Sequence, residues 1–317
     1  MNNCRVNVII PTKNRFRKLR RALKSVNQQD FFDFDVWVIN DGSTDETRDY
    51  LESSQLKSDY PNISSINILT NKRSVGAAAS RNYALAKAGG EFVAFLDDDD
   101  VWDPQYLQQQ VMQLDQNTDA VATCAQYLEC DRSGCVSLPD LRPLFDYQDS
   151  LVHLLSECFV HTMSVFVCRR SLFSSIGLLD ESLSITHDLD WYSRVLLSGQ
   201  TIITPSGPAL VKREIPGGLV TNHRRWYEED RRVLDRVLQK QPGYQSSQRH
   251  VRAHRELFFA KLAAKRSDYG FTIKRILGAF LCAPVRSVRI VIRRISRNFD
   301  QPVHHYSTSY ESERPDS

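Results

Sequence analysis

The first hundred residues alternate short apolar runs with stretches in which apolar residues recur at helical spacing. The apolar runs predict four strands, at Val6–Ile10, Asp35–Ile39, Ile63–Leu69 and Glu91–Leu96. Between them, the sequence predicts helices at Phe16–Gln28 and Ser80–Ala88, and a third that begins near Glu46 with Ser43 or Thr44 as its cap. This alternation indicates a mostly parallel sheet with helices on both faces.

The pattern becomes more irregular after Pro104. Helices are expected at Tyr106–Leu114, Leu151–Cys158 and Trp191–Leu197, and strands at Ala120–Tyr127, Glu129–Val136, Ser164–Cys168, Thr201–Pro205 and Pro208–Lys212. The chain then continues with two expected helices, at Glu228–Val237 and Val251–Lys265. Residues 226–299 therefore form a helical extension, and the polar residues 300–317 are expected to be disordered.

The last apolar segment, Phe271–Phe299, is also the most basic. Its apolar residues recur at helical spacing, Pro284 divides it in two, and it contains no Asp or Glu. Its basic residues are Lys274, Arg275, Arg286, Arg289, Arg293, Arg294 and Arg297. Such a basic amphipathic pattern suits an anionic membrane surface. A helix packed on its own domain with a solvated basic face fits the pattern equally well.

Composition narrows the class of protein. With 317 residues, 41% hydrophobic content and 25% charge, the chain fits a soluble globular protein. A net charge of +3 gives no indication of nucleic-acid binding. The seven cysteines form no Cys-x-x-Cys pair, which argues against a zinc site or a disulfide framework and fits a reducing cytoplasm. We find no secretory signal and no run of the ~18–20 apolar residues that span a bilayer, so we expect a cytoplasmic protein, peripheral at most on the inner face of the plasma membrane.

Four consecutive carboxylates, Asp97–Asp100, follow the fourth predicted strand. Like charges at the end of a buried strand raise the cost of ionising one another, so packing alone gives no reason for them. A divalent cation does, because hard carboxylate oxygens suit Mg²⁺ or Mn²⁺. The alternative is an acidic, solvated loop.

Polar clusters follow the other predicted strands as well. Thr12–Asn14, Asp41 and Arg73–Gly76 each come at or after a strand end. In open α/β sheets, ligands bind outside the carboxyl ends of the strands. Together with the four carboxylates, these clusters outline a nucleotide pocket.

The ordered set of motifs resembles a family 2 glycosyltransferase of the GT-A fold. The matching segments are Val8–Arg15, Val38–Asp45, Gly76–Asn82, Phe95–Asp100, Arg169–Glu181 and His187–Trp191. The resemblance implies a Rossmann-like α/β domain at residues 1–225. Residues 1–103 would be its nucleotide-sugar-binding half, and residues 104–225 its acceptor-binding half.

The resemblance also implies the roles of single residues on the donor side. Pro11, Thr12 and Asn14 would line the base pocket, and Asp41 would accept a hydrogen bond from the base, typically uracil. Gly76, with no Cβ, would let the backbone approach the donor closely, and Arg81 would reach the nucleotide or its pyrophosphate. Asp97, Asp98 and Asp99 match an Asp-x-Asp signature. Asp99, together with Asp97, would hold Mn²⁺ or Mg²⁺, and either Asp97 or Asp98 would face the ribose.

The same resemblance implies a single inversion at the anomeric carbon. The acceptor hydroxyl must lose its proton as it attacks, and a carboxylate general base serves that purpose. Asp188 holds the matching position, with Asp190 second. The family usually has an acidic residue directly before this Asp, whereas this chain has His187. The alternative for Asp188 is a helix N-cap, where Asp is favoured.

We therefore expect an inverting, metal-dependent glycosyltransferase in surface polysaccharide or lipopolysaccharide biosynthesis. Its donor would be a UDP-sugar, and its acceptor a glycan or a lipid-linked glycan. The alternatives are a non-catalytic relative that binds nucleotide or serves as a scaffold and, less favoured, a sugar-nucleotide pyrophosphorylase. A pyrophosphorylase would need a glycine-rich loop where this chain has Pro11–Arg15. A dinucleotide-dependent oxidoreductase fails for lack of a Gly-x-Gly-x-x-Gly turn.

Overall fold

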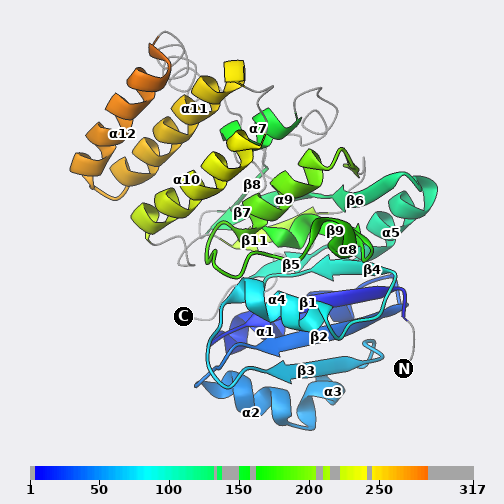
Figure 1. Cartoon of the computed structure of the whole chain (residues 1–317). Coiled ribbons are helices and arrows are strands. Elements are labelled where there is room, and N and C mark those ends of the chain that lie inside the picture. Colours follow the sequence, from blue (N-terminus) through cyan, green and yellow to red (C-terminus); the bar gives the residue numbers. More distant parts are fainter. Residues whose placement is uncertain are drawn as a thin grey trace.

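A computed structural model of the chain describes residues 4–131, 134–137, 150–157, 162–204, 210–214, 222–240 and 245–284 (Figure 1). The main sheet has seven strands: β1 (Val6–Thr12), β2 (Phe34–Asn40), β3 (Ile66–Thr70), β4 (Phe92–Phe95), β6 (Ala120–Cys124), β9 (Phe166–Arg169) and β10 (Thr201–Ile203). Their order is β10-β6-β9-β4-β1-β2-β3. Every neighbouring pair is parallel except those of β9, which runs antiparallel to β4 and to β6. The predicted mostly parallel sheet is confirmed.

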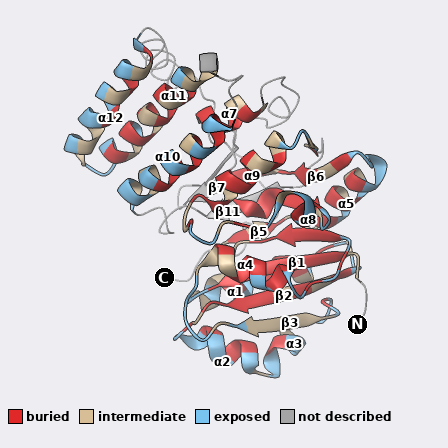
Figure 2. Ribbon diagram, viewed as in Figure 1, coloured by how far each residue is buried: buried red, intermediate tan, exposed pale blue. Residues whose placement is uncertain are grey.

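The centre of this sheet is fully enclosed. Every residue of β1 and β4 is buried (Figure 2), and all of them are apolar except Asn7 and Thr12 of β1. Because β1, β2 and β4 run in one direction, their carboxyl ends lie at the same edge of the sheet. Thr12, Asp41 and Asp97, each at or just beyond one of these ends, are brought to that edge by topology alone.

A second, smaller sheet was not predicted. It has four strands in the order β5 (Asp100–Trp102), β11 (Leu210–Glu214), β7 (Gln126–Asp131) and β8 (Gly134–Ser137). The prediction of one strand at Ala120–Tyr127 is wrong, because β6 and β7 belong to different sheets and the chain changes sheet at Ala125. The amide of Ala125 donates to the carbonyl of Val165 at 2.8 Å. The segment Ala120–Tyr127 contains no Gly or Pro that would signal such a change.

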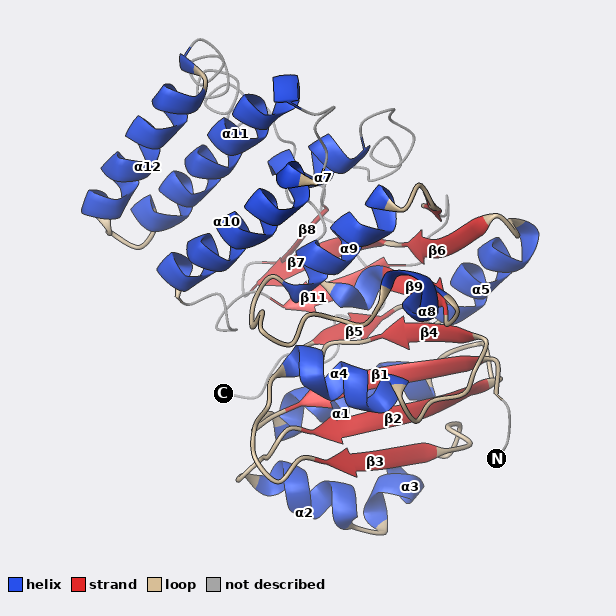
Figure 3. Cartoon of the chain, viewed as in Figure 1, coloured by secondary structure: helices blue, strands red, loops and turns tan. Residues whose placement is uncertain are grey.

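Helices cover both faces of the main sheet, as predicted (Figure 3). The helices up to residue 197 are α1 (Phe16–Asn27), α2 (Glu46–Glu52), α3 (Gln55–Asp59), α4 (Ala77–Leu85), α5 (Tyr106–Gln116), α7 (Ser150–Glu157), α8 (Leu172–Ile176) and α9 (His187–Leu197), of which α7 packs on α9 and on α11 (Gln245–Ala264). Helix α4 packs on β1 and β2. Helix α1 lies on the opposite face and buries Leu19, Leu23 and Val26 (Figure 3).

The cap of α2 differs from the prediction. The side chain of Asp45, not that of Ser43 or Thr44, accepts the capping hydrogen bond, from the amide of Thr47 at 3.1 Å. Ser43 and Thr44 are engaged elsewhere. Ser43 Oγ accepts from the amide of Asn14 at 3.0 Å, and the amide of Thr44 donates to Asn14 Oδ1 at 2.7 Å.

Three further helices form the C-terminal part of the described chain: α10 (His223–Gln239), α11 (Gln245–Ala264) and α12 (Tyr269–Cys282). Helix α10 packs on α9, and α11 packs on α7, α10 and α12. The domain boundary expected after residue 225 falls inside α10. The later part of the basic segment, residues 285–299, and the tail at 300–317 lie outside the described residues.

The described residues also bear on the membrane and disulfide expectations. None of their helices is both long enough and apolar enough to cross a membrane. Among the described residues, Cys4, Cys124, Cys168 and Cys282 are free thiols.

Candidate active site

The acidic loop after β4 contains a buried carboxylate, Asp98, whose side chain is 6% exposed. Thr12 Oγ1 donates to its Oδ2 at 2.8 Å, and Arg15 Nη1 donates to its Oδ1 at 2.8 Å. Burial raises the pKa of Asp98 to about 6, although the positive charge of Arg15 opposes this shift. Asp98 therefore ties the end of β4 to the end of β1 and the start of α1.

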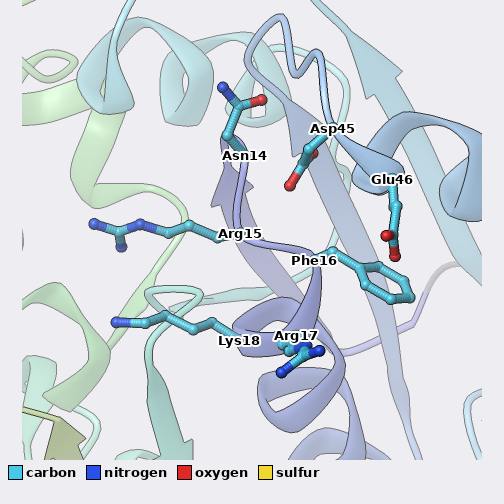
Figure 4. Close-up of a pocket in the computed structure, with 7 residues that line it drawn as sticks. All are labelled: Asn14, Arg15, Phe16, Arg17, Lys18, Asp45 and Glu46. Atoms are coloured by element: carbon cyan, nitrogen blue, oxygen red, sulfur yellow. The ribbon is translucent and has the colours of Figure 1, made fainter.

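Asp99 is more open, with 21% of its side chain exposed. The same Arg15 Nη1 donates to Asp99 Oδ2 at 2.8 Å, and Lys18 Nζ lies 3.7 Å from that oxygen. Beside these cations lies an open depression of about 360 Å³, lined by Asn14, Arg15, Phe16, Arg17, Lys18, Asp45 and Glu46 (Figure 4). The first turn of α1 thus brings its positive charge to the acidic loop.

Asp97 contacts the opposite side of the site. Arg81, only 3% exposed, donates to Asp97 through Nη2 and to His187 Nε2 through Nη1, the latter at 2.9 Å. Burial lowers the pKa of His187 to about 3, with a further lowering from Arg81. His187 is therefore neutral at pH 7, and Arg81 joins α4, the end of β4 and the start of α9.

Two residues outside the predicted set complete the acidic loop. Thr162 Oγ1 lies 2.9 Å from Asp97 Oδ2 and 2.7 Å from Asp100 Oδ2, with a single proton to donate. Ser164 Oγ accepts from the amide of Asp97 at 2.9 Å. Thr162 is the N-cap of a short 3₁₀ turn at Met163–Val165, and Ser164 lies within that turn. Nothing in their sequence context points to the site.

Asp41 is buried at the end of β2 and saturated with donors. Its carboxylate accepts from Asn71 Nδ2 at 2.9 Å, Ser74 Oγ at 2.7 Å and the amides of Val75 and Gly76 at 2.8 and 3.0 Å. Burial alone would raise the pKa of Asp41, but these donors outweigh it and hold that pKa below its ordinary value. In this structure Asp41 therefore fixes the loop that leads into α4.

Two glycines shape the same region. Gly76 has φ +95°, and a Cβ built there would meet open space. Backbone conformation thus requires this glycine, and the space beside it stays open for a ligand. Gly42 has φ +71°, and a Cβ there would lie 2.9 Å from the amide nitrogen of Ser74, so the Gly42 turn and the Asp41-held loop are in direct contact.

The predicted base-pocket residues differ in exposure. Pro11 and Thr12 are buried in β1, whereas Asn14 is exposed with φ +53°. Asn14 bonds to Ser43 and Thr44 through the contacts described above, which hold the loops after β1 and β2 together.

Helix α9 carries the two candidate general bases, Asp188 and Asp190, in different environments. Asp188 is half-buried in the first turn. The helix N-cap is Thr186, so the alternative of Asp188 as N-cap does not hold. Asp190 is 1% exposed and accepts from Arg194 Nε at 2.9 Å and from Arg236 Nη1 of α10 at 3.0 Å.

Helix α10 also holds the start of α9. Glu229 accepts from Ser184 Oγ at 2.6 Å and from the amides of Ser184 and Ile185 at 3.0 and 2.8 Å. Burial works against ionisation of Glu229, yet these donors keep its pKa below the ordinary value. An ionised carboxylate thus sits at the N-terminus of α9, where the helix dipole favours negative charge.

The acidic loop fits a cation that arrives with a phosphate ligand. Among the described residues no three His, Cys, Asp or Glu side chains converge as a cation site. Mg²⁺ sites of phosphate-handling enzymes commonly use only one or two carboxylates plus substrate phosphates, and carboxylate oxygens also suit Mn²⁺. Asp97 and Asp99, with 30% and 21% of their side chains exposed, provide such a pair.

Comparison with protein families gives one match, to glycosyl transferase family 2, over residues 7–177. A curated relative, an uncharacterized glycosyltransferase of Rickettsia typhi, is 25% identical over 92% of both chains. The Escherichia coli enzyme WfgD, named UDP-Glc:alpha-D-GlcNAc-diphosphoundecaprenol beta-1,3-glucosyltransferase, is 36% identical over 37% of this chain and 44% of its own length.

Solved structures share the fold. The mannosyltransferase PcManGT of Pyrobaculum calidifontis, in complex with GDP-Man and Mn²⁺, matches with a TM-score of 0.61 and 18% identity over 96% of this chain and 83% of its own. S. aureus TarS 1–349 in complex with UDP matches with a TM-score of 0.60 and 20% identity over 89% and 82%. The GT-A fold expected from the sequence is confirmed.

Replacing Asp41 by Asn tests its role in holding the loop. The amide would present N–H groups to donors, so we expect the free energy of unfolding at pH 7 to fall by about 2 kcal/mol, the value of hydrogen bonds to a charged group. The folded-state pKa of Asp41 is depressed, so its contribution is full above the ordinary carboxyl pKa and is lost as the pH falls through the folded-state value. Urea unfolding from pH 7 downward should show the difference from wild type shrinking below about pH 4. A difference independent of pH would contradict this role.

Proposed function

The chain belongs to glycosyl transferase family 2, and from that premise we propose that it moves a sugar from a nucleoside diphosphate, UDP in the first instance, to an acceptor hydroxyl with inversion. One observation carries the proposal. The acidic loop Asp97–Asp99 lies at the carboxyl edge of the sheet, and Arg81 connects Asp97 directly to the helix turn that bears Asp188. Donor and acceptor groups of a transfer reaction would meet between these two elements.

The donor binds across the loops that follow β1, β2 and β3. Pro11, Thr12 and Asn14 line the base pocket, and the open space beside Gly76 admits the ribose or diphosphate. Asp41 contributes to base binding in one of two ways. Its carboxylate exchanges one of its loop donors for an N–H group of the base, or the base contacts the loop amides that Asp41 holds in place. TarS, whose fold this chain shares, binds UDP, which supports a uridine nucleotide.

Asp99, with Asp97, holds the divalent cation, Mn²⁺ or Mg²⁺. The ion would supply charge neutralisation to the departing diphosphate. Asp98, buried and bonded to Thr12 and Arg15, keeps the loop in place and is the better candidate to face the ribose side. The guanidinium of Arg81 orients Asp97 by binding its Oδ1, while Oδ2 of Asp97 faces Thr162.

Asp188 is the general base. The acceptor oxygen attacks the anomeric carbon as its proton passes to the Asp188 carboxylate. The bond from that carbon to the diphosphate breaks on the opposite face, and its electron pair leaves with the nucleotide. Asp190, already engaged by two guanidinium groups, positions α9 against α10.

The acceptor is a lipid-linked glycan of surface polysaccharide synthesis, met at the inner face of the plasma membrane. The name of WfgD describes an enzyme that acts on a sugar linked to diphosphoundecaprenol, and this relative supports a lipid-linked acceptor. The structure adds a surface of suitable character, the exposed apolar stripe of α12 (Tyr269, Ile273, Ile276, Leu277, Phe280 and Leu281). Leu281 is 86% exposed, whereas Arg275 of the same helix is turned inward to Tyr227 and Glu256.

An anionic bilayer is the occupant that the charges around this stripe favour. Lys265 and Arg266, just before α12 in the sequence, and Lys274, within α12, are exposed. No acidic residue occurs in the sequence between Tyr269 and Phe299. A peripheral helix of this kind binds through buried apolar area and attraction to anionic lipids.

A non-catalytic, nucleotide-binding relative is the second candidate. The observation in its favour is that Arg15, Lys18 and Arg81 already neutralise the carboxylates that would hold the cation. Such a protein would bind nucleotide without metal dependence, so one binding experiment separates the two candidates.

Calorimetric titration with UDP, with and without Mn²⁺, tests the donor site. We expect Mn²⁺ to tighten UDP binding by at least about tenfold, a usual size for coupling between two ligands. Asp99→Ala should remove this metal effect while leaving metal-free UDP binding unchanged. Binding of UDP by wild type without any effect of Mn²⁺ would instead support the non-catalytic candidate.

Asp188→Asn tests the base. We expect UDP binding in the presence of Mn²⁺ to stay at the wild-type level and the rate of transfer to fall by at least about 10²-fold, the usual cost of losing a general base. The matched variant Asp190→Asn should lower stability, by about 2 kcal/mol for hydrogen bonds to charged groups, with a smaller effect on the rate. If Asp190→Asn loses transfer while stability holds, the base is Asp190.

Replacing Leu277 and Leu281 together by Gln tests the apolar stripe. Each Leu contributes about 1.5–3 kcal/mol when buried. We therefore expect co-sedimentation with vesicles that contain phosphatidylglycerol to fall by more than about tenfold, with the fold unchanged by circular dichroism. Phe32→Gln, an equally exposed position near β2, is the control and should not change binding. Unchanged vesicle binding, or loss of a dimer by light scattering, would assign the stripe to another partner.

A further inference from the structure

A single guanidinium nitrogen bridges two carboxylates of the acidic loop. Arg15 Nη1 lies 2.8 Å from Asp98 Oδ1 and 2.8 Å from Asp99 Oδ2. Lys18, three residues later on α1, reinforces the second contact at 3.7 Å. Because Arg15 comes from the loop after β1, the cation that neutralises the pair belongs to a different element from the acids.

This bridge uses the oxygen that a metal ion would need. Asp99 is the proposed cation ligand, and Asp99 Oδ2 already accepts from Arg15. A divalent cation at this oxygen would stand close to a fixed positive charge, and like charges at such short range repel each other strongly. Binding of the ion and retention of the Arg15 contact therefore oppose each other.

The surroundings leave Arg15 room to move. Its side chain is 30% exposed, that of Lys18 is 31% exposed, and the depression of Figure 4 opens beside both. A released guanidinium has a natural partner in this site, because its planar fork binds phosphate oxygens in pairs. The diphosphate that would accompany the cation brings these oxygens.

We propose that Arg15 is a positioning residue that takes the place of the metal in the donor-free protein and transfers to the diphosphate when nucleotide and metal bind. The bridge keeps Asp98 and Asp99 ordered and neutralised while the site is empty, and it makes metal binding depend on the nucleotide. This inference rests on the proposed function, since it assumes that the nucleotide and the cation bind at this loop.

Arg15→Ala separates this role from simple structural support because two affinities should change in opposite directions. Mn²⁺ alone should bind the variant about tenfold more tightly than wild type, because its competitor is gone. UDP in the presence of Mn²⁺ should bind about tenfold more weakly, because the phosphate partner is gone. Calorimetry measures UDP, and the electron paramagnetic resonance signal of free Mn²⁺ measures the metal. Lys57→Ala, an equal change of charge at an exposed position of α3, is the control and should leave both affinities at the wild-type level.

Each outcome has a distinct meaning. Weaker or unchanged binding of Mn²⁺ alone to Arg15→Ala, with normal coupling in wild type, would overturn the inference and leave the proposed function intact. Absence of any Mn²⁺ effect on UDP binding by wild type would instead overturn the proposed function. If Arg15→Ala fails to fold, Arg15→Gln keeps a polar side chain of similar reach, and Mn²⁺ should raise its melting temperature more than that of wild type.

Discussion

The structure around the site depends on compensating four negative charges at the end of a buried strand. β4 is apolar and enclosed, and Asp97–Asp100 follow it within two residues. An isolated buried carboxylate is expensive, so each must find cations or hydroxyls. Arg15 and Lys18 come from the start of α1 and Arg81 from α4. Ion pairs with these carboxylates thus hold the start of α1 and helix α4 at the acidic loop.

The start of α9 is held by a second carboxylate system, and it involves the C-terminal helices. Glu229 of α10 collects amides at the start of α9, and Arg236 of α10 reaches Asp190 of α9. The turn that bears Asp188 therefore has its position set by residues of α10. A domain boundary at residue 225 would therefore divide α10, the helix that holds the start of α9.

The sequence predicted what is local and missed what joins distant segments. Asp97–Asp99 and Asp41 were recognisable because each directly follows an apolar strand, and parallel topology then brings the strand ends together. The partners were not recognisable in the same way. Arg15 lies 84 positions from Asp99 and Thr162 lies 65 from Asp97, and no local pattern distinguishes a bridging arginine or a hydroxyl from a surface residue. The change of sheet at Ala125 is missed for the same reason, because no Gly or Pro between Ala120 and Tyr127 marks the end of one strand and the start of the next.

His187 shows how one departure from the expected motif alters the electrostatics of the site. An acidic residue there would take part of the charge of Arg81, a buried cation that bonds to Asp97. His187 is kept neutral by burial, accepts a single hydrogen bond at Nε2 and leaves that charge for Asp97. Asp97 is consequently held more firmly toward α4 than an acidic neighbour would allow. The more open Asp99, whose competitor Arg15 is half-exposed and able to move, is then the carboxylate best placed to exchange an internal cation for an external one.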